Sequence, residues 1–443
     1  MLGGVVIFII VGLLVLECAR YGWKGAFISS FWVFTLFYIL SYPVKYLFIV
    51  VYNIEYVAPV KPDSESLFLA LLLSFMFWLS VYIFRRRPHH MVNISTLHKK
   101  GDEQAGWGLW LRPDKLILLG LIGVSLLYFY QLLEAGGGAF FPAYEGNAQN
   151  EARVGSGALF LLYTLYLKAF FASLFMIRKR PPLFIFVISC LVIVIGFSEM
   201  LLLGTRRPLF LMLYAFIVWL VINKKSPISV TILAFFPLVM SLLAPIGQII
   251  RYSFVNLVVE NVAPDINLDY ILVSIGSTFE GIEHLANYLS KLSVAQVLFG
   301  VDQGMAWLFN SGLSLIPRAV WDSKPMLYGS VAEQYYLYPR MYDAGAGQTT
   351  LPPGIIVDAM YGFGIFFMFV LAYFYAKTFS VMDKSLFVRP VKPGFELLAT
   401  AVVYIHMFNL VRGGTAIIMM IVMLQIIAFA LYFLERIKLG IRL

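Results

Sequence analysis

Apolar runs of about 20 residues recur along this chain from one end to the other, and a helix needs a run of that length to cross the hydrocarbon core of a bilayer. Hydrophobic residues make up 61% of the 443 positions and charged residues only 13%, a composition too apolar for a soluble fold of this size. Backbone polar groups inside lipid must be paired within the protein, and the sequence lacks the alternating pattern of a membrane barrel. The chain is therefore predicted to be an all-α polytopic membrane protein, built as one helical bundle.

Eleven transmembrane spans account for these runs. We place them at about residues 2–19, 26–51, 67–84, 116–134, 156–177, 183–203, 209–222, 228–246, 354–376, 395–411 and 415–435. They divide the chain into eight spans within residues 1–247, a long water-facing segment over 248–353 and three spans within 354–443. Pro43 is predicted to kink the second span, and Lys45 lies close to the outer end of that span.

The distribution of Lys and Arg predicts which side of the membrane each loop faces. Basic residues accumulate in cytoplasmic loops, and here they follow the first span at Arg20 and Lys24, the third at 85–87 and the fifth at 178–180. This pattern predicts a periplasmic N-terminus, a cytoplasmic C-terminus and one large periplasmic loop over 248–353. The net charge of +9 is on this interpretation a topology signal, so we expect the lipid bilayer and no nucleic acid as a partner.

A set of basic residues is predicted to lie on the periplasmic face, against the usual preference. A guanidinium group is always charged, and its planar fork matches phosphate oxygens. Such a cluster suits a lipid-linked phosphate or diphosphate whose tails remain in the membrane; the alternative is that some members bind phospholipid headgroups or cap helices. The set comprises Arg206, Arg207, Arg251, Arg318, Lys324, Arg340 and Arg412.

Residues 277–292 carry apolar side chains at intervals of three and four residues, which predicts an amphipathic helix in the large loop. Glu283 lies at the margin of its apolar stripe, and His284 lies further round. A carboxylate at such a margin is partly desolvated, which raises its basicity toward that of a general base, whereas an imidazole already titrates near neutrality. Either residue is a candidate base, and either fits the plain surface of a helix equally well.

Two aromatic residues further along the loop are candidates for glycan binding. Trp321 and Tyr328 present flat faces that stack on sugars or sit at the membrane interface.

Short motifs follow one another around this loop in an order that resembles a known family. They are the Gly-Thr-Arg turn at 204–206, the Arg-Tyr pair at 251–252, the Glu-x-Leu-Ala element at 283–286, the Ile-Pro-x-x-x-Trp and basic-Pro pattern at 316–325, and Arg412 just outside the tenth span. With these motifs the chain resembles the Wzy-type oligosaccharide repeat unit polymerases, the O-antigen polymerase family of bacterial surface polysaccharide pathways.

The resemblance implies a glycosyltransferase with a GT-C-like helical bundle in the bacterial inner membrane. Such an enzyme moves a growing glycan from undecaprenyl diphosphate onto the terminal sugar of an incoming lipid-linked repeat unit at the periplasmic face. It implies no cofactor, and a co-polymerase that sets chain length is a partner implied by the family. Because the outer face lacks a convincing acidic pair for a divalent ion, we also expect metal-independent chemistry.

The expected site residues fall into three groups under this resemblance. Glu283, ahead of His284, is expected to be the catalytic base. The diphosphate is expected to bind Arg206, Arg207, Arg251, Arg318, Lys324 and Arg412, and the acceptor glycan is expected to bind Arg340, Trp321 and Tyr328.

Three other functions fit part of the sequence. An O-antigen ligase uses the same donor but passes the glycan to lipid A core or to a protein. A flippase or transporter for lipid-linked oligosaccharide also needs cations and aromatic residues, but it should carry charge through the bundle interior and show related halves, whereas the basic cluster here is one-sided. A scaffold in a polysaccharide assembly complex has no need of Glu283.

Overall fold

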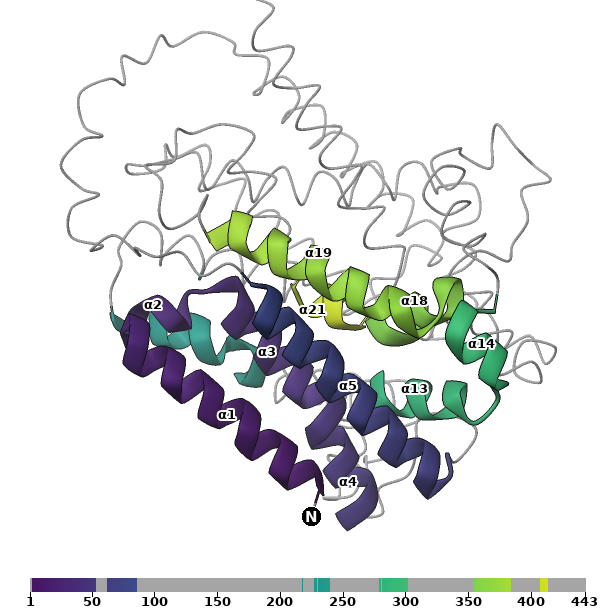
Figure 1. Cartoon of the computed structure of the whole chain (residues 1–443). Coiled ribbons are helices and arrows are strands. Elements are labelled where there is room, and N and C mark those ends of the chain that lie inside the picture. Colours follow the sequence, from purple (N-terminus) through teal and green to yellow (C-terminus); the bar gives the residue numbers. More distant parts are fainter. Residues whose placement is uncertain are drawn as a thin grey trace, which may run out of the picture.

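The computed structural model describes residues 2–52, 62–85, 217, 227–228, 230–239, 279, 281–301, 354–383 and 407–412 (Figure 1). Secondary structure within these residues is helical, without a strand. Four of the described helices are long and apolar enough to cross a membrane, namely Leu2–Arg20, Ser30–Val51, Ser64–Phe84 and Ile365–Asp383. The prediction of a helical membrane protein is confirmed at this level, while the count of eleven spans, the GT-C-like architecture and the large loop remain predictions.

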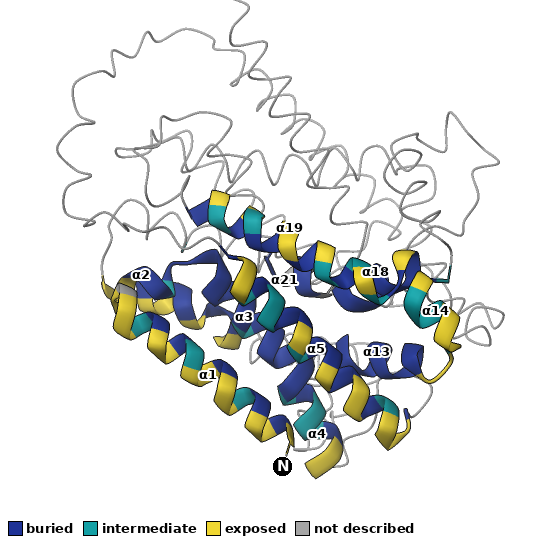
Figure 2. Ribbon diagram, in the orientation of Figure 1, coloured by how far each residue is buried: buried dark blue, intermediate teal, exposed yellow. Residues whose placement is uncertain are grey.

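The first span, α1 (Leu2–Tyr21), lies along one edge of the described bundle (Figure 1). Its side chains Val6, Ile10 and Leu14 recur every four residues and are buried. The opposite face exposes large apolar side chains such as Phe8 (Figure 2), which suits a helix that faces lipid.

The second span is the most buried of the four and consists of three consecutive helical segments. These are α3 (Ser30–Ile39), the π-helical turn η1 (Leu40–Val44) and α4 (Lys45–Tyr52), and α2 (Trp23–Phe27) joins them to α1. The hydroxyl of Ser29 caps α3 by accepting a hydrogen bond from the backbone N–H of Trp32 (3.1 Å). The interruption predicted at Pro43 takes the form of this π turn, because proline has no N–H to continue the regular ladder.

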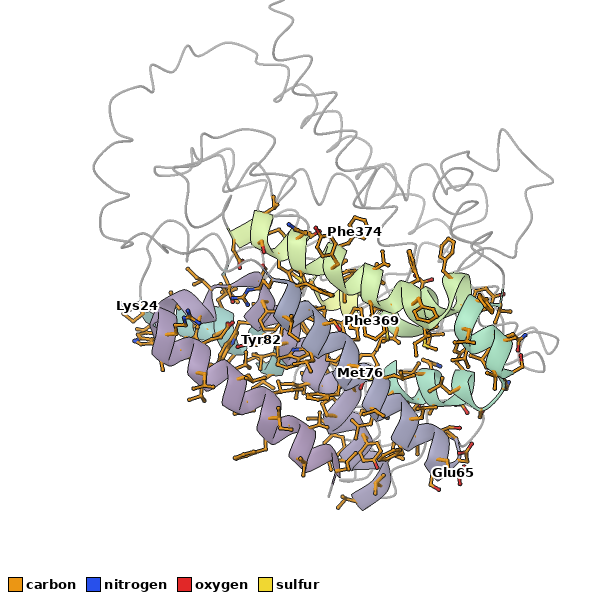
Figure 3. All side chains as sticks on the ribbon, in the orientation of Figure 1. Lys24, Glu65, Met76, Tyr82, Phe369 and Phe374 are labelled. Carbon is orange, nitrogen blue, oxygen red and sulfur yellow. The ribbon has the colours of Figure 1, made fainter. Side chains whose placement is uncertain are left out.

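The third span, α5 (Ser64–Phe84), packs along α19 (Ile365–Asp383), and side chains fill the space between them (Figure 3). α5 begins at an aspartate cap, since Asp63 Oδ1 accepts a hydrogen bond from the backbone N–H of Ser66 (2.7 Å). The N-terminus of α5 therefore lies three residues before the predicted start at 67, and its end at Phe84 is as predicted.

The ninth span departs from its predicted bounds, 354–376. The structure divides that range at Gly364 into α18 (Ile355–Phe363) and α19. Gly364 has a φ of 76°, and a Cβ at this position would overlap the carbonyl oxygen of Leu298, so the turn requires glycine. The apolar run also continues beyond residue 376, where Phe379 and Met382 are buried, and the membrane helix therefore extends to Asp383.

Three short helices pack against these spans. α13 (Gly281–Leu289) and α14 (Val294–Phe299) belong to the predicted large loop, and α21 (Met407–Arg412) belongs to the predicted tenth span. α13 packs against α5, η1 and α18, and α21 packs against α3 and α18. The segment after the eighth predicted span therefore returns into the bundle at α13.

Aromatic side chains fill the interior between the second, third and ninth spans. Tyr38 stacks on Tyr42 with 4.5 Å between ring centroids, and Phe34 lies 5.0 Å from Phe379 of α19. The hydroxyl of Tyr38 donates a hydrogen bond to the backbone carbonyl of Ser74 in α5 (2.6 Å). We call this set the aromatic column, and its members are Phe31, Phe34, Tyr38, Tyr42, Phe77, Trp78, Tyr375 and Phe379, all of them buried.

Candidate functional site

Helix α13 is buried along its whole length, from Gly281 to Leu289. The sequence predicts instead a helix over 277–292 with one buried stripe and a solvated polar face. The prediction of a solvated face is wrong, because α13 lies between α5, η1 and α18 and not on the surface of the bundle. Both candidate bases are consequently removed from solvent, with Glu283 0% and His284 1% exposed.

Glu283 forms a buried ion pair with Lys45, the first residue of α4 (Figure 1 shows the two helices). The Lys45 Nζ atom lies 2.7 Å from Glu283 Oε1, and the two side chains are 1% and 0% exposed. Burial of a charge is costly unless the charge is paired. The ammonium of Lys45 and the carboxylate of Glu283 can therefore be buried because each compensates the other. Lys45 is a functional candidate that the sequence analysis placed only near the end of a span. The general signal was present, because charged residues inside membrane spans are expensive and commonly functional.

Tyr42 positions the first turn of α13 beside the first turn of α18. A Cβ at Gly281 would lie 3.0 Å from the Tyr42 ring, and a Cβ at Gly354 would lie 3.1 Å from the Tyr42 hydroxyl and 3.5 Å from Gly281 Cα. Gly354, the N-cap of α18, has a φ of 90°, which a side chain would strain. The two helix N-termini thus meet at η1, one turn of helix before Lys45.

Both helices that meet at Tyr42 carry an acidic residue in the first turn. These residues are Glu283 in α13 and Asp358 in α18, and Asp358 is 2% exposed. A carboxylate in this position is favourable because the N-terminus of a helix carries a partial positive charge. Asp358 also lies within electrostatic range of Tyr375 in the aromatic column. The site is therefore the buried ion pair of Lys45 and Glu283, with a second buried carboxylate, Asp358, in the first turn of the neighbouring helix α18. His284 and Asn287 are buried on the same short helix as Glu283.

Arg412 is the one predicted diphosphate-binding residue whose backbone falls in the described part of the chain, where it ends α21. α21 packs against α3 and α18, so Arg412 belongs to the same group of helices as Lys45 and Glu283. The other predicted site residues lie outside the described residues; they are Arg206, Arg207, Arg251, Arg318, Lys324, Arg340, Trp321 and Tyr328. In the described residues, no group of three or more His, Cys, Asp or Glu side chains is placed to hold a metal ion.

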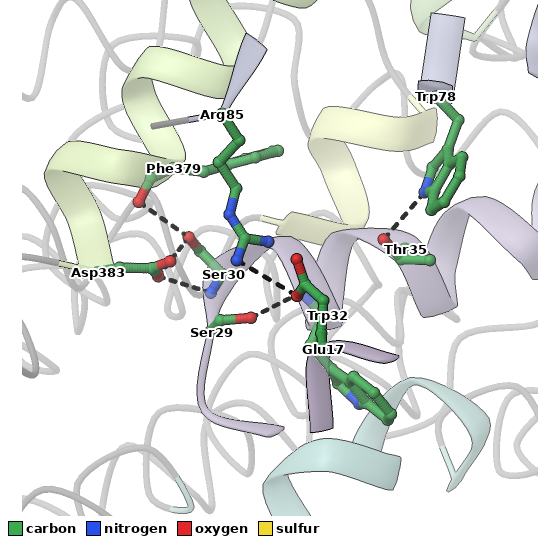
Figure 4. A network of polar contacts seen from close by, with 9 residues as sticks. All are labelled: Glu17, Ser29, Ser30, Trp32, Thr35, Trp78, Arg85, Phe379 and Asp383. Carbon is green, nitrogen blue, oxygen red and sulfur yellow. Dashed lines mark hydrogen bonds and ion pairs between the residues drawn. The ribbon is translucent and has the colours of Figure 1, made fainter. Parts of the chain in front are cut away.

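A second cluster of buried charges joins the ends of four helices (Figure 4). The Arg85 guanidinium Nη2 lies 3.3 Å from Glu17 Oε2, and its Cζ lies 4.6 Å from the centroid of the Phe31 ring. Asp383 Oδ1 accepts hydrogen bonds from the backbone N–H (2.7 Å) and the hydroxyl (2.6 Å) of Ser30. We call Glu17, Ser30, Arg85 and Asp383 the Arg85 cluster. Arg85 follows the third span, as predicted, as the C-cap of α5, and its side chain is buried, with 6% exposed.

The Arg85 cluster also fixes the relative directions of the described spans. It brings together residues near the C-terminal ends of α1, α5 and α19 and the first residue of α3. α1, α5 and α19 therefore run in one direction and the second span in the other, as the predicted topology requires. Ser30 and Lys45 are 15 residues apart on the second span, so the two charge clusters are separated by about 22 Å along the helix.

Comparison of the chain with protein-family models, curated proteins and solved structures gives no match. The function is therefore inferred from the residues of this chain and their geometry.

Proposed function

We propose that this protein is a membrane glycosyltransferase that polymerises undecaprenyl-diphosphate-linked oligosaccharide repeat units at the periplasmic face of the bacterial inner membrane, in the synthesis of O-antigen or a related surface polysaccharide. The observation that carries the proposal is the position of Glu283. This carboxylate belongs to the Glu-x-Leu-Ala motif at 283–286, and it lies where the segment after the eighth predicted span packs back against membrane helices. A lipid-linked substrate would present its reacting group at such a boundary.

The proposed reaction requires a base and a set of cations. Glu283 accepts the proton of the acceptor hydroxyl, and the hydroxyl oxygen forms a bond to the anomeric carbon of the donor glycan. The bond between that carbon and the diphosphate oxygen breaks, and undecaprenyl diphosphate leaves with the electron pair. Cations aimed at the diphosphate stabilise the charge that develops on it, a role that we assign to Arg206, Arg207, Arg251, Arg318, Lys324 and Arg412, with Arg340, Trp321 and Tyr328 on the acceptor glycan.

Reconstitution with purified lipid-linked repeat units tests this proposal. Wild-type protein in vesicles should produce a ladder of polymers, with or without a chelator, whereas Glu283→Gln should lower chain growth by at least about 100-fold. Glu17→Gln is the matched control, because it removes a buried carboxylate from the Arg85 cluster and should leave chain growth per folded protein unchanged. Arg206→Ala, Arg318→Ala and Arg412→Ala should also abolish the ladder. Full chain growth by Glu283→Gln would move the role of base to His284.

The same experiment separates polymerisation from ligation. A ladder formed from repeat units alone shows that one repeat unit is the acceptor for another. An O-antigen ligase would give no ladder in this mixture and would need lipid A core or a protein as the acceptor.

A flippase or transporter for lipid-linked oligosaccharide is the second candidate, and one observation favours it. Buried charges occur at both ends of the second span, in the Arg85 cluster and at Lys45 with Glu283, whereas the sequence analysis expected a one-sided distribution. Within the described helices, the aromatic column packs the space between the two ends, and its members are buried. Loss of single repeat units from the cell surface after deletion of the protein would favour transport; surface display of single units without polymer supports the polymerase.

A further inference from the structure

Lys45 has no role in the reaction as set out above, although it is a buried lysine within a candidate membrane span. Its ammonium lies 2.7 Å from the carboxylate that is proposed to be the base. At this distance the ammonium occupies Glu283 Oε1, an oxygen that the proposed reaction needs as the proton acceptor. The ion pair and the proposed chemistry therefore compete for Glu283.

Apolar contacts also hold α13 in the bundle. The apolar residues Ile282, Leu285 and Ala286 are 0% exposed and anchor the helix, and Gly281 packs against Tyr42. A buried ion pair contributes little net stability compared with apolar side chains of similar volume, because both ions lose their hydration. Packing alone therefore does not account for two charges at this position.

The local structure at Lys45 suits an ammonium that changes partners. The π turn η1 immediately precedes Lys45, and such turns frequently occur at functional sites. Lysine carries a compact charge on a flexible four-carbon stem, so it can exchange one anion for another by changing rotamers. A diphosphate carries more negative charge than a carboxylate and competes effectively for this ammonium.

We propose that Lys45 binds the diphosphate of the lipid-linked donor and leaves Glu283 when it does so. This inference rests on the proposed function and adds a residue and an order of events to it. Before the donor binds, Lys45 holds Glu283 in the ion pair. After the donor binds, the Lys45 ammonium neutralises the diphosphate, and the released Glu283 carboxylate accepts the proton of the acceptor hydroxyl as the glycosidic bond forms and the bond to the diphosphate breaks. The base then becomes available only when the donor is in place.

Binding of undecaprenyl diphosphate to the full-length protein in nanodiscs tests this exchange without relying on activity. Lys45→Met should weaken binding by about 10-fold or more, because a cation is lost. Glu283→Gln should strengthen binding by about 10-fold, because the ammonium no longer has to leave a carboxylate. The two members of one ion pair thus shift affinity in opposite directions. If the pair is only a structural tie, the two variants leave the affinity unchanged or change it in the same direction, and either result overturns the inference.

Further variants guard against loss of folding and against general anion binding. The double variant Lys45→Met with Glu283→Met removes both charges of the ion pair and should bind as weakly as Lys45→Met. The matched control, Glu17→Met with Arg85→Met, removes the other ion pair and should bind like wild type. The affinity for phosphatidylglycerol should not depend on Lys45. If Lys45→Met weakens binding of phosphatidylglycerol as much as binding of undecaprenyl diphosphate, the site binds phospholipid headgroups in general and the inference is overturned. A wild-type protein that binds through Lys45 but forms no polymer would overturn the proposed function and leave the binding role intact.

Discussion

The two buried charge clusters lie at opposite ends of the second span and are built in different ways. The Arg85 cluster joins only membrane spans, and its contacts include two hydrogen bonds from Ser30 to Asp383 and the stacking of Arg85 over Phe31. The second cluster contains the ion pair of Lys45 with Glu283, which joins a span to a short helix from the predicted extramembrane segment. The Arg85 cluster holds membrane helices together. The Lys45–Glu283 pair connects the bundle to the part of the chain where chemistry is expected.

This difference leads us to predict that buried charge serves two purposes in one bundle. The planar Arg85 guanidinium lies over the Phe31 ring and pairs with the Glu17 carboxylate. The nearby Asp383 carboxylate accepts hydrogen bonds from the backbone N–H and the hydroxyl of Ser30. Such a network resists rearrangement, because several contacts must break together. The Lys45 ammonium has a flexible stem and follows an irregular turn, which suits the exchange of partners that we propose.

Exchange of the charges between Lys45 and Glu283 is the strongest way to test this contrast. The double variant Lys45→Glu with Glu283→Lys restores an ion pair, so thermal unfolding in detergent should be close to that of wild type. Chain growth should nevertheless fall by about 100-fold or more, because the base and the diphosphate ligand have exchanged positions. A charge-exchanged protein that forms the normal ladder would show that the pair is structural, like the Arg85 cluster.

Removal of the guanidinium from the Arg85 cluster should affect stability and spare the chemistry. Arg85→Met leaves Glu17 and Asp383 buried without a compensating cation, which should cost about 3–5 kcal/mol. Combination with Glu17→Gln should recover part of this loss, because one of the two uncompensated charges is then absent. Thermal unfolding in one detergent measures both effects. Loss of chain growth per folded molecule, at unchanged membrane insertion, would contradict the structural role.

The exposed carboxylate of Asp63 provides a reference for the two buried clusters and should give the smallest effect. Hydrogen bonds from the backbone N–H and then the hydroxyl of Ser66 lower the pKa of Asp63 from its ordinary value of 3.8. A lowered pKa in the folded state means that the charged cap stabilises the protein above pH 3.8 and loses this effect as the pH falls through the lowered pKa. The unfolding temperatures of wild type and Asp63→Asn should therefore differ slightly at neutral pH and converge in acid. A constant difference over that range would exclude the charge as its cause.

The positions of the described spans were largely predictable from the sequence. The third span was predicted to end at residue 84, as it does, because Arg85 follows the apolar run directly. The ninth span was misplaced because hydropathy does not register the conformation of Gly364, whose φ of 76° divides one apolar run into two helices. Hydropathy correctly places Arg85 after the third span, but it contains no information about the contacts of its side chain with Glu17 and Phe31.

The candidate site was predictable only in part. Periodicity identified a helix that contains Glu283 and His284, but it assumed that the polar face of this helix is solvated. A polar face can also be buried if another segment supplies a matching charge, and periodicity within one segment contains no information about that partner. Lys45 is the partner in question, and it lies 238 positions away in the sequence.

The sequence by itself determined the environment of this chain, because long apolar runs can be stable only where lipid replaces water around them. It also determined which residue types are available for the diphosphate site and the base that we propose. Only the tertiary structure decided that α13 enters the bundle, that Tyr42 receives the first turns of two helices, and that Glu283 meets Lys45. These outcomes depend on contacts between segments far apart in the chain, where steric fit and charge compensation act together and neither can be read from a local pattern.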